Sequence, residues 1–235
     1  MCIFMKKENS QGPISQINFS LRKLTLRKPL LSLAIVSGLL LANLIQTPAL
    51  ADFEAGWTAY QNGNFAKALK EWRVLAKKGD AKAQFNLGVM YDEGRGVKED
   101  RQKAINWWVK AAERKNKEAQ HNLGMTYLFG SGVNIDYVKA VSWLKKASNQ
   151  GSARSQYSLG KMYSEGLGVK KDKTEAFNWI MRAAESGVYQ AQYNLGKIFR
   201  DGRGVERDAK KAAQWFLAAA KQGYAKAQNH IGVRL

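Results

Sequence analysis

Two copies of a tyrosine–lysine pair are the residues whose types and spacing best suit recognition of another molecule. Tyr157 precedes Lys161 by four residues, and Tyr193 precedes Lys197 by the same interval. Side chains four residues apart share one face of a helix, so each pair would place an aromatic ring beside a cation. Such a surface suits an acidic peptide or an anionic glycan, because aromatic side chains dominate interface energetics. The chemistry that these pairs indicate is binding.

Catalytic and metal-binding chemistry finds little support in the sequence. Beyond residues 1–51 the chain holds two histidines, His121 and His230, and no cysteine, since the only cysteine is Cys2. Neither histidine belongs to a metal-ligand spacing, and no serine lies in a nucleophile elbow. Acidic pairs such as Asp92–Glu93 fall beside predicted turns, where capping and solvation explain them. We therefore predict that the protein is not an enzyme and needs neither cofactor nor metal.

A Gly-x-Gly-Val motif that occurs four times invites comparison with a phosphate-binding loop. Its first copy runs from Gly94 to Val97. A phosphate-binding loop follows a strand, whereas apolar residues at helical spacing precede each of these copies. A glycine just past a helix adopts the left-handed conformation that ends it, and Asp100 stands where a carboxylate caps the next helix. The motif therefore predicts a turn between two helices.

These turns belong to a repeat of 36 residues. A fixed period of this size is typical of stacked helical units rather than of a domain with one central core. Two of the recurring columns are Leu87, Leu123, Leu159 and Leu195, and Trp107, Trp143, Trp179 and Trp215. We expect the tryptophans to fill the groove between neighbouring units, where each contributes several kcal/mol to stability.

The repeat divides the chain into predicted segments. Four full repeats span residues 81–116, 117–152, 153–188 and 189–224, and each supplies two helices. Residues 52–80 form a divergent helical pair that acts as an N-terminal cap, and residues 225–235 supply a C-terminal capping helix. The result is an all-α protein of eleven helices. Where later repeats close with glycine, the first has Lys115–Asn116, and we expect Asn116 to take the left-handed conformation.

Residues 1–51 resemble a secretory signal rather than part of the array. A basic leader precedes an apolar stretch from Leu30 to Ile45, and small residues precede Asp52. We predict cleavage after Ala51 and a periplasmic or secreted protein. The apolar stretch is shorter than the roughly 20 residues of a membrane span. An uncleaved N-terminal anchor is the alternative, and it is the only membrane attachment that we expect.

The charge of the chain indicates anionic partners. It carries 38 basic and 19 acidic residues, a net charge of +19. The leader contains six of the basic and one of the acidic residues, which leaves +14 for residues 52–235. A charge of this size attracts negatively charged molecules, although lysine-rich helix faces that serve solubility would give the same value. Nucleic acid is not favoured, because the export signal directs the protein away from it.

At the recurring leucine, glycine, valine, aspartate and tryptophan columns, the chain resembles the Sel-1-like repeat family, a relative of tetratricopeptide arrays. The resemblance covers residues 81–224 in four copies. It implies a right-handed α-solenoid of stacked helix-turn-helix repeats that serves as a scaffold or adaptor for protein complexes. Exported bacterial members of this kind take part in envelope assembly, signalling or host contact.

The same resemblance implies where a partner would bind. Positions two before and two after the repeat leucine are expected to face the concave groove, together with neighbouring asparagines. The alternative for the tyrosines is packing against the next helix. Predicted partners are other envelope proteins or acidic or amphipathic peptide segments, with an anionic polymer such as peptidoglycan or an acidic polysaccharide as the alternative. The predicted groove residues are Phe85, Asn86, Val89, His121, Asn122, Met125, Tyr157, Lys161, Tyr193, Asn194 and Lys197.

Overall fold

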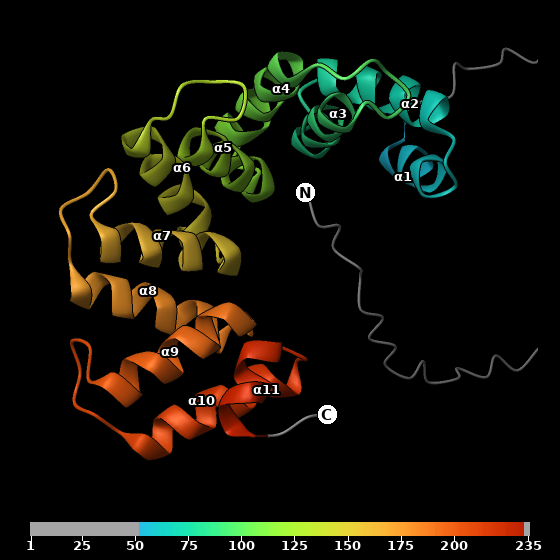
Figure 1. Cartoon of the computed structure of the whole chain (residues 1–235). Coiled ribbons are helices and arrows are strands. Elements are labelled where there is room, and N and C mark those ends of the chain that lie inside the picture. The colour runs from blue at the N-terminus through green and yellow to red at the C-terminus, as the bar shows by residue number, and fades with distance from the viewer. Residues whose placement is uncertain (1–51, 233–235) are drawn as a thin grey trace, which may run out of the picture. The chain divides into compact units, whose positions relative to one another are not determined.

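The computed structural model describes residues 52–232, which form a stack of helices (Figure 1). The predicted leader, residues 1–51, and the last three residues lie outside the described part of the chain. The chain divides into two units, residues 1–46 and 47–235, and the described helices belong to the second.

Eleven helices and no strand are found in the described residues, which confirms an all-α solenoid of helix-turn-helix repeats. No described helix is long and apolar enough to cross a membrane. The helices are α1 (Phe53–Gln61), α2 (Phe65–Lys77), α3 (Ala81–Glu93), α4 (Arg101–Glu113), α5 (Lys117–Phe129), α6 (Tyr137–Asn149), α7 (Ala153–Glu165), α8 (Lys173–Glu185), α9 (Tyr189–Asp201), α10 (Ala209–Lys221) and α11 (Ala225–Ile231).

The predicted turn chemistry sets the helix ends. At the start of α4, the Asp100 carboxylate accepts a hydrogen bond from the backbone N–H of Lys103 at 2.9 Å, and the aspartates of the other repeats act alike. Gly94 ends α3 in the left-handed conformation, with φ of 66°. A side chain at such a position strains the backbone, which explains why glycine recurs there.

One predicted turn residue is wrong. Lys115, with φ of 63°, takes the left-handed conformation at the end of the first repeat. Asn116 has φ of −66°, and its side-chain oxygen accepts a hydrogen bond from the backbone N–H of Ala119 at 2.8 Å. Asparagine is among the best N-capping residues, so Asn116 caps α5 and leaves the strained position to the lysine before it.

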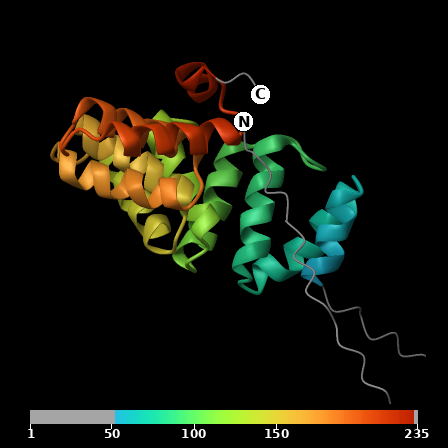
Figure 2. The ribbon, with the colours of Figure 1, turned by 90° about the horizontal axis from the view of Figure 1, so that it is seen from below.

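The most extensive contacts within residues 52–232 join consecutive helices, and side-chain hydrogen bonds also link the first helices of neighbouring repeats. Figures 1 and 2 show the two helices of each repeat lying side by side. Contacts within a repeat are more extensive than contacts between repeats. Each repeat therefore relies on its immediate neighbours to cover its apolar faces.

The second helix of each repeat carries two adjacent apolar positions, of which one packs within the repeat and the other packs against the preceding unit. Trp108, Leu144, Ile180 and Phe216 are buried and lie against a glycine of the first helix in their own repeat, so close that a Cβ there would collide. The tryptophans one position earlier contact the cluster of the preceding unit, as expected: Trp107, Trp143, Trp179 and Trp215.

A glutamine column ties each repeat to the one before it. Gln120 Nε2 donates a hydrogen bond to the carbonyl oxygen of Ala112 at 3.0 Å, which joins α5 to the last turn of α4. The same bond recurs along the stack for Gln84, Gln156, Gln192 and Gln228. Each of these carbonyl oxygens also accepts a hydrogen bond from a backbone N–H of the following turn, so the glutamine adds a second bond that joins two repeats.

Candidate binding cleft

The apolar members of the predicted groove columns lie on α3, α5, α7 and α9, where they pack between repeats. Phe85 and Val89 are half-buried against the cluster of α4 and α5. Met125 lies against the cluster of α6 and α7, and Tyr157 and Tyr193 lie against that of α8, α9 and α10. These side chains therefore pack against neighbouring repeats, which for Tyr193 includes the cluster of α10 and α11.

His121 is buried, with 8% of its surface exposed. Its Nδ1 atom lies 2.8 Å from Ser155 Oγ, across the contact between α5 and α7. Burial, assisted by the nearby charge of Arg154, lowers the pKa of His121 to about 4. The imidazole is therefore neutral near pH 7, and it belongs to the contact between two repeats rather than to an open surface.

Asn194 and Tyr157 bind each other. The Asn194 side-chain amide donates a hydrogen bond to Tyr157 Oη at 2.9 Å, which ties α9 to α7. Burial raises the pKa of the Tyr157 hydroxyl. Asn86 and Asn122 are half-buried at the equivalent positions of α3 and α5. The bond between Tyr157 and Asn194 thus links the third repeat to the fourth.

The two predicted lysines lie beside a cleft. Lys161 is exposed, and Lys197 Nζ lies 5.8 Å from the centre of the Tyr193 ring. Both line a cleft of about 340 Å³ formed by α7, α8 and α9, together with Asn194. Side chains of α8, among them Phe177, supply its apolar wall.

The cleft is strongly cationic. Its basic side chains are Lys161, Lys171, Lys173, Lys197 and Arg203, and its one carboxylate is Glu165. Within the described residues, none of the four lysines forms a salt bridge. Lys171, Lys173 and Arg203 were not among the predicted groove residues, although the basic run around Asp172 is visible in the sequence. Reasoning from helix faces overlooked side chains that the loops bring to the same cleft.

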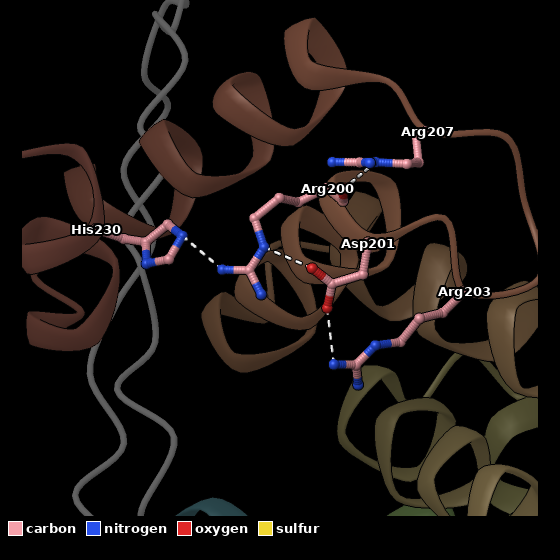
Figure 3. Close-up of polar contacts among 5 residues, drawn as sticks. All are labelled: Arg200, Asp201, Arg203, Arg207 and His230. Carbon is pink, nitrogen blue, oxygen red and sulfur yellow. Dashed lines mark hydrogen bonds and ion pairs between the residues drawn. The ribbon is translucent and has the colours of Figure 1, made fainter.

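Arg203 is held at the edge of the cleft by Asp201. The two side chains form an ion pair of 2.7 Å, and Asp201 also pairs with Arg200 Nε at 2.6 Å, as Figure 3 shows. Hydrogen bonding from Arg200, together with both positive charges, lowers the pKa of Asp201. Arg200 Nη1 in turn lies 3.0 Å from His230 Nε2 on α11, and Arg207 Nε donates to the Arg200 carbonyl oxygen at 3.0 Å. The Asp201 carboxylate thus holds two cations, Arg200 and Arg203, beside the cleft.

The arrangement is suited to holding a negatively charged group. A concave site with excess positive charge raises the local concentration of anions and strengthens their binding. Among residues 52–232, no group of three or more His, Cys, Asp or Glu side chains is placed to hold a metal ion.

Comparison with known proteins identifies the repeat. The Sel1 repeat model matches residues 81–116, 117–152, 153–188 and 190–224. The chain belongs to the Sel1 repeat family. Sel1 repeat proteins are generally non-catalytic scaffolds that bind other proteins.

Two solved structures are similar to this Sel1 repeat chain. One is a protective antigen present in uropathogenic Escherichia coli strains, 37% identical with a TM-score of 0.72 over 77% of this chain and 39% of that chain. The chain therefore spans well under half the length of that protein. The other is a Sel1 repeat protein from Oxalobacter formigenes, 33% identical with a TM-score of 0.71 over 75% of this chain and 73% of that chain. No curated protein matches the chain.

Proposed function

We propose that this Sel1 repeat protein is a non-enzymatic scaffold of the bacterial cell envelope that binds an acidic segment of another envelope protein. The binding site is the cleft between α7, α8 and α9. The observation that carries the proposal is the charge of that cleft, five basic side chains against one carboxylate. Lys161, Asn194 and Lys197, which come from the predicted groove columns, all line it.

The cleft favours carboxylate side chains for two reasons. Its lysines lack intramolecular salt bridges, so a ligand carboxylate competes with water rather than with a protein partner. Its apolar wall, which includes Phe177 and Ile180, lowers the local dielectric constant and strengthens each ion pair. Lys197 also lies beside the Tyr193 ring. An acidic peptide segment supplies both the charges and the aliphatic groups that such a site can hold.

The proposed location rests on the leader. Residues 1–51 carry the basic, apolar and small-residue layout of a secretory signal. A mature chain without cysteine is compatible with the oxidising periplasm. We therefore place the protein in the periplasm or outside the cell.

Partner capture from solubilised bacterial envelope tests the proposal. The bait variants are Lys161→Glu with Lys197→Glu, and the control Lys70→Glu with Lys77→Glu, which makes the same change in net charge on exposed positions of α2. We expect the wild type and the control to recover the same partner protein and the cleft variant to lose it, because reversed charges repel its carboxylates. Recovery of that partner by all three baits would show that the cleft is not the binding site.

Direct binding of an anionic envelope polymer is the second candidate, favoured by the +14 charge of residues 52–235. Attraction by overall charge is spread over the surface and is screened by salt. If overall charge drives binding, the amount of protein that co-sediments with purified peptidoglycan should fall equally for the cleft variant and the control, relative to the wild type, and should vanish at high salt. A partner protein that only the cleft variant loses would instead favour the scaffold.

A further inference from the structure

The loop of the second repeat carries an apolar patch that the other repeats lack. Its four side chains are well exposed: Phe129 at 66%, Ile135 at 56%, Tyr137 at 38% and Val138 at 68%. We call these four residues the repeat-two patch. At the same positions the other repeats carry polar or charged residues, with the single exception of Ala209. Phe129 corresponds to Glu93, Glu165 and Asp201, and Ile135 to Glu99, Lys171 and Arg207. Tyr137 corresponds to Arg101, Lys173 and Ala209, and Val138 to Gln102, Thr174 and Lys210.

The fold does not need the repeat-two patch. Gly130 and Gly132 turn the chain with φ of 68° and 80°, much as Gly94 and Gly96 do in the first repeat. Asp136 caps α6 as its counterparts cap the other second helices. Loops of the same conformation are thus built elsewhere from polar side chains. Exposed apolar clusters of this kind mark sites where another molecule binds.

The repeat-two patch lies next to the cationic cleft along one edge of the stack. Gly168, in the loop after α7, lies so close to the Tyr137 carbonyl and the Val138 amide that a Cβ there would collide with both. That same loop carries Lys171 and leads into Lys173, two of the cations of the cleft. Figure 1 shows the loops after α5 and α7 following one another along this edge. A single extended ligand can therefore reach both surfaces.

We propose that the repeat-two patch binds the apolar side chains of an acidic protein segment whose carboxylates enter the adjoining cleft. The inference rests on the proposed function and adds the chemistry of the partner, an amphipathic segment with apolar side chains at one end and acidic ones at the other. A second copy of this chain is a poor occupant, because it would bring Lys171 and Lys173 against their own counterparts. A flat bilayer is also a poor occupant, since only a projecting acidic group fills the concave cleft.

Selection from a random peptide display library tests the composition of this ligand. Three purified proteins serve as bait: the wild type, the cleft variant Lys161→Glu with Lys197→Glu, and a patch variant. The patch variant combines Phe129→Glu, Ile135→Lys and Val138→Thr, which are the residues of the third repeat at those positions. It leaves the net charge unchanged and keeps Tyr137, whose backbone contacts Gly168. Unchanged helical content and melting temperature establish that each variant is folded.

We expect the wild type to select peptides rich in both apolar and acidic residues. The patch variant should select acidic peptides without the apolar enrichment, and should bind the wild-type peptides about tenfold more weakly, as expected for the loss of one to two kcal/mol of apolar contact. Wild-type and patch-variant peptides with the same apolar content would overturn the inference. Loss of acidic enrichment only in the cleft variant supports the proposed function. Acidic enrichment that survives in the cleft variant contradicts the proposed function and, with it, the placement of the ligand carboxylates in the cleft, whereas binding of apolar side chains to the repeat-two patch is decided by the patch variant.

Two further measurements expose the competing occupants. Wild-type dimers in sedimentation that the patch variant does not form would identify the repeat-two patch as a contact between copies. Co-sedimentation of the wild type, but not of the patch variant, with vesicles of phosphatidylethanolamine and phosphatidylglycerol would identify a membrane surface. Either result would overturn the proposed protein ligand; a monomer that ignores vesicles supports it.

Discussion

At the scale of single residues, departures from the repeat are the most informative positions in this protein. Lys115 takes a backbone conformation that the other repeats assign to glycine, and His121 occupies a buried position where its column otherwise holds Phe85, Tyr157 and Tyr193. Both residues are compatible with the fold, and we expect each to reduce its stability, Lys115 through its backbone conformation and His121 at low pH. Each therefore gives a direct test of the energetics.

Replacing Lys115 with glycine should stabilise the protein. A residue with a side chain pays roughly 1–2 kcal/mol in the left-handed region, and the greater freedom of glycine in the unfolded chain offsets about half of this gain. We expect Lys115→Gly to raise the free energy of unfolding by about 0.5–1 kcal/mol in urea titrations. Lys115→Ala, which keeps the strain, is the control. A Gly variant no more stable than the Ala variant would contradict the assignment of strain to this residue.

The buried His121 should make stability depend on pH. Its pKa is about 4 in the folded protein and about 6.5 in an unfolded chain. Between these pKa values the unfolded chain binds more protons than the folded protein. The contribution of neutral His121 to the free energy of unfolding is therefore fully present above about pH 6.5 and is lost as the pH drops toward about 4. His121→Phe removes this contribution and leaves the Ser155 hydroxyl bonded to Ser152 Oγ at 2.9 Å. If the melting temperatures of the wild type and of His121→Phe fall equally from about pH 7 to about pH 5, His121 does not contribute to the pH dependence of stability.

At the scale of helices, the close approach of the two helices in each repeat depends on a glycine. A Cβ at Gly160 would lie 2.7 Å from Ile180 Cγ1 and 3.2 Å from the Ala176 carbonyl oxygen. Glycine inside a helix is normally unfavourable by about 1 kcal/mol relative to alanine. Here the space available decides the choice, because the second helix occupies the position of a side chain.

Gly160→Ala should therefore destabilise the protein, against helix propensity. We expect a loss of about 1–3 kcal/mol in the free energy of unfolding, as for other overpacked cores. Adding Ile180→Ala, which removes the colliding Cγ1 atom, should make the double variant more stable than the sum of the single effects. Strict additivity, or a stabilising Gly160→Ala, would show that α7 and α8 separate without cost.

The helices and their caps could be predicted from the sequence because they depend on local signals. These signals are the 36-residue period, the glycines that end helices and capping residues such as Asp100. It did not predict Lys171, Lys173 and Arg203 in the cleft, since the distance between two loops depends on the stacking of whole repeats. The glutamine column was visible as five residues at the same interval, yet its hydrogen bonds need the geometry of two helices. Apolar content likewise did not reveal that Phe129 is exposed, because only the structure separates core from surface.

At the scale of the whole array, stability should be local. Within residues 52–232 the most extensive contacts join consecutive helices, and the further side-chain bonds described above join neighbouring repeats. Damage at one end therefore reaches the other only through intervening repeats. Trp72, fully buried in α2, contacts Phe53 and Tyr60 of α1. This aromatic cluster is the core of the N-terminal cap.

Trp72→Ala tests that locality. Removing a buried tryptophan costs roughly 3–5 kcal/mol, so we expect hydrogen exchange to accelerate in α1, α2 and α3. Protection in α8, α9 and α10 should stay within error of the wild type. An equal loss of protection in all helices would indicate one cooperative unit and contradict a stack held by nearest neighbours.

The central claim is that the cleft between α7, α8 and α9 binds carboxylates through its own lysines rather than through the overall charge. Its most direct test is the affinity of a labelled glutamate-rich peptide for the wild type, the cleft variant Lys161→Glu with Lys197→Glu, and the control Lys70→Glu with Lys77→Glu. We predict saturable binding that the cleft variant weakens about tenfold or more and that the control retains. Equal weakening in both variants would contradict it, because net charge alone would then explain the binding.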